Sequence, residues 1–149
     1  MLIRELTTDQ CFDLLERSNL GRLACARDGQ PYIVPVNYSF DRVRKCLYVF
    51  STIGQKVAWM RENPKVCVEV DEVRDKDHWT TVVIFGRYEE ITDGDTDARK
   101  RAQDLFQHRV EWWFPAAGKL PEKEAEAVVL YRIVIDRLSG RHASRGTKA

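Results

Sequence analysis

The sequence has no surplus of either charge, and this absence excludes several classes of partner. Its 149 residues include 24 Lys and Arg against 23 Asp and Glu, a formal net charge of +1. No overall field therefore favours a nucleic acid, an acidic membrane or a polyanionic substrate. We expect any ligand to be recognised by a local group of side chains.

Cysteine and histidine are too few and too scattered for a metal centre. Cys11, Cys25, Cys46 and Cys67 include no C-x-x-C pair of the kind that zinc or redox chemistry uses. We expect four reduced thiols that pack in the interior, in a reducing compartment. The three histidines have no metal-ligand spacing either, so we expect no metal site and read them as surface residues.

Long apolar runs are also absent. No segment approaches the roughly 20 apolar residues of a membrane span, and residues 1–6 turn polar before a signal-peptide core can form. We therefore expect a cytoplasmic protein without a membrane partner. The length and the 44% of apolar residues are typical of one folded domain, and no repeat or low-complexity linker divides it.

Three segments have helical spacing. Thr7 and Gln10 form a capping box before the first, and Gly21 ends it. The second stops at Asn63, because a residue before proline avoids the α region. The expected helices are 8–19, 54–63 and 95–109.

Period-two alternation predicts six strands. Asp28-Gly29 is the dipeptide of a tight hairpin turn, and Asp41–Lys45 supplies a second turn. The expected strands are 22–26, 30–40, 46–51, 66–71, 79–92 and 127–135, with a charged loop over 72–78. Strands joined mainly by hairpins predict a mainly β fold, a closed or partly closed antiparallel barrel with peripheral helices. Residues 1–138 form this domain, and 139–149 read as a basic, flexible tail.

One segment combines the features of a phosphate site. Between Tyr48 and Ala58 a strand ends in Ser51 and Thr52, and a glycine and Lys56 then enter a helix. Free amides at a helix N-terminus, hydroxyls and an ammonium group all favour an anion. The alternative is that Ser51 or Thr52 caps the helix and Lys56 is simply solvated.

Four segments in order, Pro31–Tyr38, Leu47–Lys56, Asn63–Val70 and Trp79–Glu90, resemble the FMN-binding split-barrel family. This is the pyridoxamine 5'-phosphate oxidase-like group, and within it the branch that contains the nitroimidazole-resistance flavoproteins. The resemblance spans residues 3–138. It implies a six-stranded antiparallel split β-barrel of Greek-key type, and a homodimer with FMN at the interface.

The resemblance also implies which residues contact the flavin. Residues of the first segment are expected at the ring edge, those of the second at the phosphate, and those of the last at the ring or phosphate, often from the other subunit. Many relatives carry a second basic residue at Gln55, so phosphate binding here is expected to depend more on Lys56. For Trp79–Thr81 the alternative is plain strand surface. The candidates are Val34, Pro35, Val36, Asn37, Phe50, Ser51, Thr52, Gln55, Lys56, Trp79, Thr80 and Thr81.

An aromatic cluster, Trp112-Trp113-Phe114-Pro115, leaves two readings open. It can form a hydrophobic latch between helix and barrel or at a dimer contact, and at least one of its tryptophans can border the flavin pocket. We take Trp112 as a further cofactor candidate.

The C-terminus argues against two activities. Arg137, Arg141 and Arg145 make it basic, but no aromatic residues alternate with them as in nucleic-acid grooves. True pyridoxine phosphate oxidases end in a segment with tryptophan and paired arginines, which this chain lacks. We therefore expect neither nucleic-acid binding nor vitamin B6 oxidation.

A flavin supplies its own redox chemistry, so the absence of a catalytic triad does not argue against an enzyme. We hypothesise an FMN-dependent oxidoreductase that reduces a small nitroaromatic or quinone-like compound with a nicotinamide donor, NAD(P)H. The alternative is a non-enzymatic protein of the same fold that stores or senses a flavin, a deazaflavin or haem. Haem is the weaker variant, since no histidine lies on a predicted strand.

Overall fold

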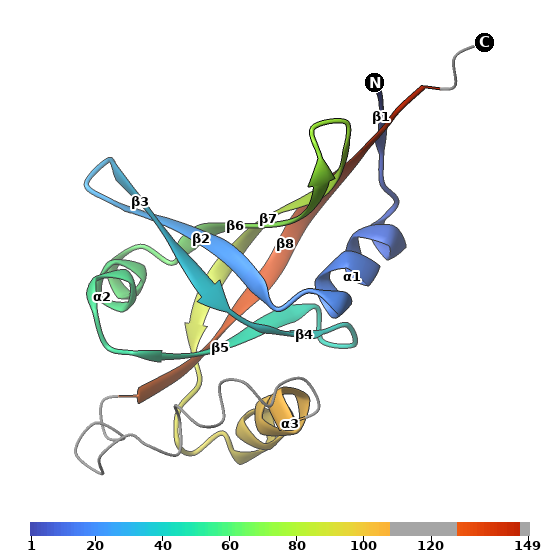
Figure 1. Cartoon of the computed structure of the whole chain (residues 1–149). Coiled ribbons are helices and arrows are strands. Elements are labelled where there is room, and N and C mark those ends of the chain that lie inside the picture. The colour runs from blue at the N-terminus through green and yellow to red at the C-terminus, as the bar shows by residue number, and fades with distance from the viewer. Residues whose placement is uncertain (108–127, 147–149) are drawn as a thin grey trace.

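A computed structural model describes residues 1–107 and 128–146, and within them eight strands and three helices (Figure 1). In chain order these are β1 (Leu2–Glu5), α1 (Thr8–Arg17), β2 (Leu20–Arg27), β3 (Gln30–Asn37), β4 (Ser39–Asp41), β5 (Cys46–Thr52), α2 (Gln55–Glu62), β6 (Lys65–Asp75), β7 (His78–Glu90), α3 (Thr96–Gln107) and β8 (Val128–Ser144).

The strands form one antiparallel sheet in the order β3-β2-β6-β7-β8-β5-β4, with β1 paired to β8. The predicted mainly β, antiparallel fold is confirmed, but six strands was too low a number. The predicted strand 30–40 is divided at Tyr38. The Tyr38 amide bonds to the Asn19 carbonyl at 3.0 Å and its hydroxyl donates to the Leu15 carbonyl at 2.9 Å. After Tyr38 the chain continues as β4, which pairs with β5.

Strand β8 corrects the prediction of a flexible tail from residue 139. It continues to Ser144, pairing first with β5, then with β7 and finally with β1. Residues 139–144 form a strand because their backbone groups hydrogen-bond to β7 and β1. The polar local sequence does not reveal this long-range pairing. The sheet therefore extends past the predicted domain boundary at residue 138.

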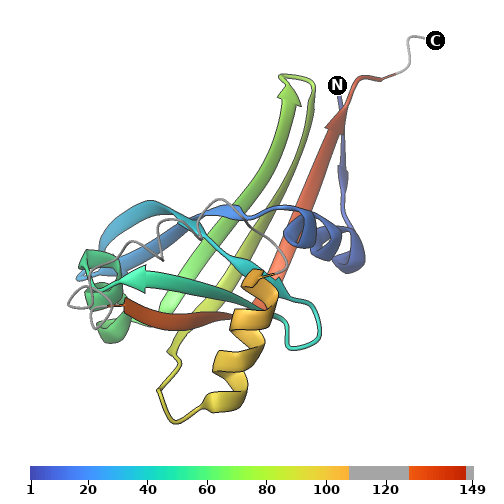
Figure 2. The ribbon, with the colours of Figure 1, turned by 60° about the horizontal axis from the view of Figure 1, so that its bottom comes forward.

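The charged segment 72–78 is not the loop that its composition predicted. It forms the end of a long hairpin in which β6 and β7 pair from Lys65 opposite Arg87 to Asp75 opposite His78. Figure 2 shows this hairpin and the end of β8 extending beyond the rest of the sheet. His78 and His142 consequently lie on strands, which corrects the expectation that no histidine does.

Helix α1 packs on the sheet and closes one end of the core (Figure 1). The predicted capping box is present: the Gln10 amide donates to the Thr7 hydroxyl at 3.2 Å, and the Thr7 amide to the Gln10 side chain at 3.0 Å. Packing against β8 is close, since a Cβ at Gly140 would lie 2.6 Å from the Cys11 Sγ. A side chain at position 140 would push α1 outward.

Helix α3 is held to the sheet by one buried carboxylate. Asp41, whose side chain is 0% exposed, accepts two hydrogen bonds from the Arg101 guanidinium and one from the Tyr48 hydroxyl. It also accepts the Val43 and Arg44 amides at 3.1 and 3.0 Å. The Asp41 carboxylate therefore joins the β4–β5 turn to α3.

The cysteines agree with the prediction in that all four are free thiols. Cys11, Cys25 and Cys46 are buried, and Cys67 is half-buried. Across residues 1–107 and 128–146, no helix has the length and apolar character needed to cross a membrane.

Candidate functional site

The segment that follows β5 has the arrangement of an anion site. Helix α2 begins after Gly54, which provides no side-chain hydrogen bond to cap it. The first helical bond runs from the Ala58 amide to the Gly54 carbonyl at 3.1 Å. The amides before Ala58 therefore precede the helical ladder, at the positive end of the helix dipole.

The alternative in which a hydroxyl caps this helix is excluded. The Ser51 hydroxyl donates to the Thr52 carbonyl at 2.9 Å, and Gly54 rather than either residue occupies the cap position. Thr52 is exposed and Ser51 half-buried beside the helix start. Both residues end β5, just before the N-terminus of α2.

Lys56 lies in the first turn of α2 and is half-buried. Desolvation by burial lowers the pKa of its ammonium group, and the nearby Cys25 thiol raises it by a smaller amount. Among residues 1–107 and 128–146 no carboxylate lies within ion-pair distance of Lys56. A half-buried cation without a counter-ion is costly, so an anion at this position would be stabilising.

Helix α2 is fixed in place by aromatic contacts. The Trp59 ring lies 5.6 Å from the Tyr32 ring of β3 and 5.0 Å from the Arg27 guanidinium of β2. Val57 and Met60 are buried beneath it. The first turn of α2 therefore has a defined position beside β2 and β3.

The predicted ring-edge segment, residues 34–37, lies on β3. This strand is at the end of the sheet order and pairs with β2 alone among the described strands, so its outer edge has backbone groups free for a ligand. Asn37 and Pro35 are exposed, Val34 is half-buried, and Val36 is buried in the core. Val36 could therefore contact a ligand only through its backbone.

Strands β3 and β5 contact one another although they do not share a hydrogen-bonded edge (Figure 1). The structure thus brings the segments 34–37 and 50–56 to the same part of the molecule. Gln55 is exposed at the start of α2, whereas the Phe50 ring packs 5.0 Å from Phe106 of α3. The Phe50 side chain therefore packs against α3.

The third predicted segment lies elsewhere in the same chain. Trp79, Thr80 and Thr81 are near the tip of the β6–β7 hairpin, and both views show this tip far from α2 (Figures 1 and 2). The Thr80 hydroxyl bonds with His142 Nδ1 at 2.8 Å, and the Thr81 hydroxyl donates to Glu69 at 3.0 Å. Within one chain, this segment and Lys56 therefore do not form a single site. Trp112 and the aromatic cluster lie outside the described residues.

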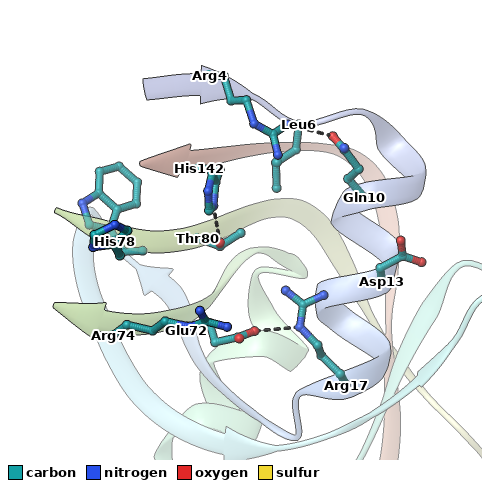
Figure 3. A pocket seen from close by; sticks show the side chains of 11 residues that line it. Arg4, Leu6, Gln10, Asp13, Arg17, Glu72, Arg74, His78, Thr80 and His142 are labelled. Carbon is teal, nitrogen blue, oxygen red and sulfur yellow. Dashed lines mark hydrogen bonds and ion pairs between the residues drawn. The ribbon is translucent and has the colours of Figure 1, made fainter. Parts of the chain in front are cut away.

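A pocket of about 370 Å³ lies near the tip of the hairpin, where α1, β1, β6, β7 and β8 meet (Figure 3). Trp79 and Thr80 line it, but most of its polar lining was missed by sequence reasoning. Arg74 belongs to the segment predicted as a loop and His142 to the predicted tail. No local signal reveals that these residues converge, because their pairing is long-range.

Comparison with known proteins decides the family. A family model described as pyridoxamine 5'-phosphate oxidase matches residues 7–142. The chain belongs to this family. The predicted resemblance is confirmed. An uncharacterized protein of Rhizobium meliloti (strain 1021) is 38% identical over 151 residues and covers 98% of this oxidase-family chain and 99% of its own length.

Solved structures agree with the family assignment. A crystal structure named as a FAD-binding protein from Mesorhizobium loti is 41% identical, covers 97% of this chain and 100% of its own, and superposes with a TM-score of 0.80. A structure named as a 5-nitroimidazole antibiotic resistance protein from Bacteroides thetaiotaomicron is 17% identical, with a TM-score of 0.69 over 95% of this chain and 89% of its own. At that identity it supports the split-barrel fold alone.

The residues present in this oxidase-family chain fit a phosphate-bearing group. The evidence is the donor set at the start of α2: uncapped amides, the hydroxyls of Ser51 and Thr52, and a half-buried ammonium group without a carboxylate partner among the described residues. A single phosphate can be neutralised here without any basic surplus in the chain.

Proposed function

We propose that the protein binds FMN, with the phosphate at the N-terminus of α2 and the ring beside β3. The observation that carries this proposal is the uncapped start of α2 next to the Lys56 ammonium group, which has no carboxylate partner among the residues that the structure describes. The free edge of β3 offers amides and carbonyls to the polar edge of a ring. The similarity to a protein named as FAD-binding, at 41% identity, supports a flavin as the class of ligand.

We further propose that the active form is a homodimer in which a second chain completes each site. Trp79–Thr81 lies far from Lys56 within one chain, so both segments can contact one flavin only if they come from different chains. The half-buried Trp79 would supply a ring beside the flavin, and Lys56 of the other chain would hold the phosphate. The small size of the chain also favours burial of further surface by dimerisation.

The proposed activity is an FMN-dependent reduction of a small nitroaromatic or quinone-like compound with NAD(P)H as donor. When bound, the flavin supplies hydride and electron transfer at its own ring. The residues of this chain bind and orient it: Lys56 and the α2 amides fix the phosphate end, and β3 fixes the ring edge. Free buried thiols accord with a reducing, cytoplasmic setting.

The first test is an absorption spectrum of the purified protein, followed by titration of the flavin-free protein with FMN, FAD and riboflavin. We expect FMN to bind at least tenfold more tightly than riboflavin, because only FMN presents the phosphate. Equal affinity for the two would refute the phosphate site. Steady oxidation of NAD(P)H with an added nitroaromatic or quinone would support the enzyme, and tight binding without turnover would instead favour a storage or sensing protein.

The composite site has its own test. Each proposed site takes Lys56 from one chain and Trp79 from the other. In a mixed dimer of a Lys56→Ala chain and a Trp79→Ala chain, one site therefore carries both substitutions and the other site carries neither. We expect each variant alone to bind FMN weakly. In the co-expressed pair about half of the dimers are mixed, so we expect about a quarter of all sites to bind FMN tightly. Recovery of none would show that both residues act within one chain's site.

A further inference from the structure

The pocket in Figure 3 carries an excess of positive charge that the described residues do not neutralise. Its two carboxylates are already paired: Glu72 accepts from Arg17 at 2.7 Å, and Asp13 from Arg42 at 2.8 Å. Two guanidinium groups of the lining, those of Arg4 and Arg74, have no such partner within the described parts of the chain, residues 1–107 and 128–146.

Arg4 and Arg74 approach the pocket from different strands. Arg4, on β1, makes one long contact of 3.4 Å to the neutral Gln10 side chain. Arg74, on β6, has no ion pair with any residue in 1–107 or 128–146. Guanidinium groups without carboxylate partners are suited to bind phosphate in a bidentate manner.

The floor of the pocket is ordered and offers a further polar group. Thr80 and His142 are directly opposite one another on β7 and β8, and their side chains bond at 2.8 Å through His142 Nδ1. This bond orients the imidazole and leaves its Nε2 atom without a described protein partner (Figure 3). Nε2 is therefore available to a ligand.

The size and the walls of the pocket indicate more than an inorganic ion. About 370 Å³ lies at the lower end of the range for organic ligands, roughly 300–1,000 Å³. Trp79 and Leu6 add apolar wall beside the charged groups. An indole face can stack on a planar base with a favourable energy that depends little on which base it is.

We propose that this pocket binds the phosphate of a nucleotide, held by Arg4 and Arg74, with its base beside Trp79. Within one chain the pocket is separate from the flavin phosphate site, since neither Lys56 nor any residue of α2 lines it. Trp79 is the residue that the two sites would share in the proposed homodimer. The same chemistry is offered by the adenylate half of FAD and by a nicotinamide nucleotide, and the experiment distinguishes these sources.

The test uses the purified full-length protein and adenosine 5'-monophosphate as probe in isothermal titration calorimetry. We expect binding of this nucleotide and at least tenfold weaker binding of adenosine, which lacks the phosphate. Arg74→Gln and Arg4→Gln are each expected to weaken nucleotide binding about tenfold or more. Lys76→Gln is the matched control, because Lys76 is an exposed cation of the same hairpin that does not line the pocket.

Both arginines are exposed, so their substitution is expected to leave the fold intact, which the thermal midpoint checks. If Arg74→Gln weakens FAD but not FMN, the source is the adenylate of FAD. If it weakens NADPH and neither flavin, the source is the nicotinamide nucleotide. The proposal is overturned if the nucleotide fails to bind at millimolar concentration, if both arginine variants bind it normally, or if FMN is weakened as much as the nucleotide. Failure of FMN to bind the wild-type protein would concern the Lys56 site alone.

Discussion

Replacement of Asp41 by Asn tests whether one buried carboxylate anchors α3. Its side chain is 0% exposed and accepts hydrogen bonds from Arg101, Tyr48 and two turn amides. Asparagine keeps one acceptor oxygen but turns an amide donor toward groups that also donate. Arg101 loses its counter-ion and is left with a neutral partner.

The size of the effect follows from how much of each partner is buried. Removing one partner of a buried ion pair costs about 3–5 kcal/mol. Arg101 is 35% exposed and can be partly rehydrated, so we expect a smaller loss, about 2–3 kcal/mol. For a chain of this length that lowers the thermal midpoint by about 5–10 °C.

The loss should depend on pH in a known direction. Burial raises the pKa of Asp41, but the hydrogen bonds from Arg101, the Arg44 amide and Tyr48 outweigh it and hold the pKa below its usual value. A lowered folded-state pKa gives stability that is complete above the unfolded value, about 3.9, and is lost as pH falls through the folded one. The wild type and Asp41→Asn should therefore differ fully at pH 7, begin to converge as pH falls below about 4, and meet only below the folded-state pKa of Asp41.

Thermal and urea unfolding at fixed protein and flavin concentration measure both the loss of stability and its dependence on pH. Asp97→Asn is the control, because Asp97 also accepts a bond from an arginine at 2.8 Å but is 82% exposed. We expect it to change stability by less than about 0.5 kcal/mol. An Asp41→Asn variant as stable as this control, or a difference that persists unchanged at low pH, would refute the reasoning.

Three further substitutions test local features. Gly54→Asp places a capping carboxylate where the flavin phosphate is proposed to bind, so FMN affinity should fall about tenfold in titration while riboflavin affinity is retained; unchanged FMN affinity would contradict this. Gly140→Ala brings a Cβ within 2.6 Å of the Cys11 Sγ and 2.8 Å of Leu6, and should cost about 1–3 kcal/mol in urea unfolding; full stability would show that α1 can move away freely. Tyr131→Phe removes a buried hydroxyl without a partner among the described atoms and should leave stability unchanged or raise it by about 1 kcal/mol; a clear loss would reveal a water or ligand on that hydroxyl.

Local structure was predictable from the sequence where a few adjacent residues determine the backbone conformation. Thr7 and Gln10 cap α1 by contacts three residues apart, and Asp28 and Gly29 have the positive φ angles, 50° and 77°, that their turn requires. The Ser51–Lys56 segment was found in the same way, because its strand end, glycine and helix start are contiguous.

Long-range pairing was not predictable from the same patterns. Residues 72–78 and 139–144 are charged and polar, yet they are strands because β6, β7, β8 and β1 pair with one another. The burial of Lys56 and its position near Cys25 depend on the packing of α2 on β2. The pocket with Arg4 and Arg74 needs five elements that no single stretch of sequence connects.

The central claim is that Lys56 and the start of α2 hold a flavin phosphate, and Lys56→Ala tests it most directly. Titrations of the variant with FMN and with riboflavin should show FMN affinity reduced about tenfold to a hundredfold, and riboflavin affinity changed by less than about threefold. Lys65→Ala, an exposed lysine at the start of β6, should change neither. Equal losses for both flavins would contradict the account, because Lys56 would then act on the ring or the fold and not on the phosphate.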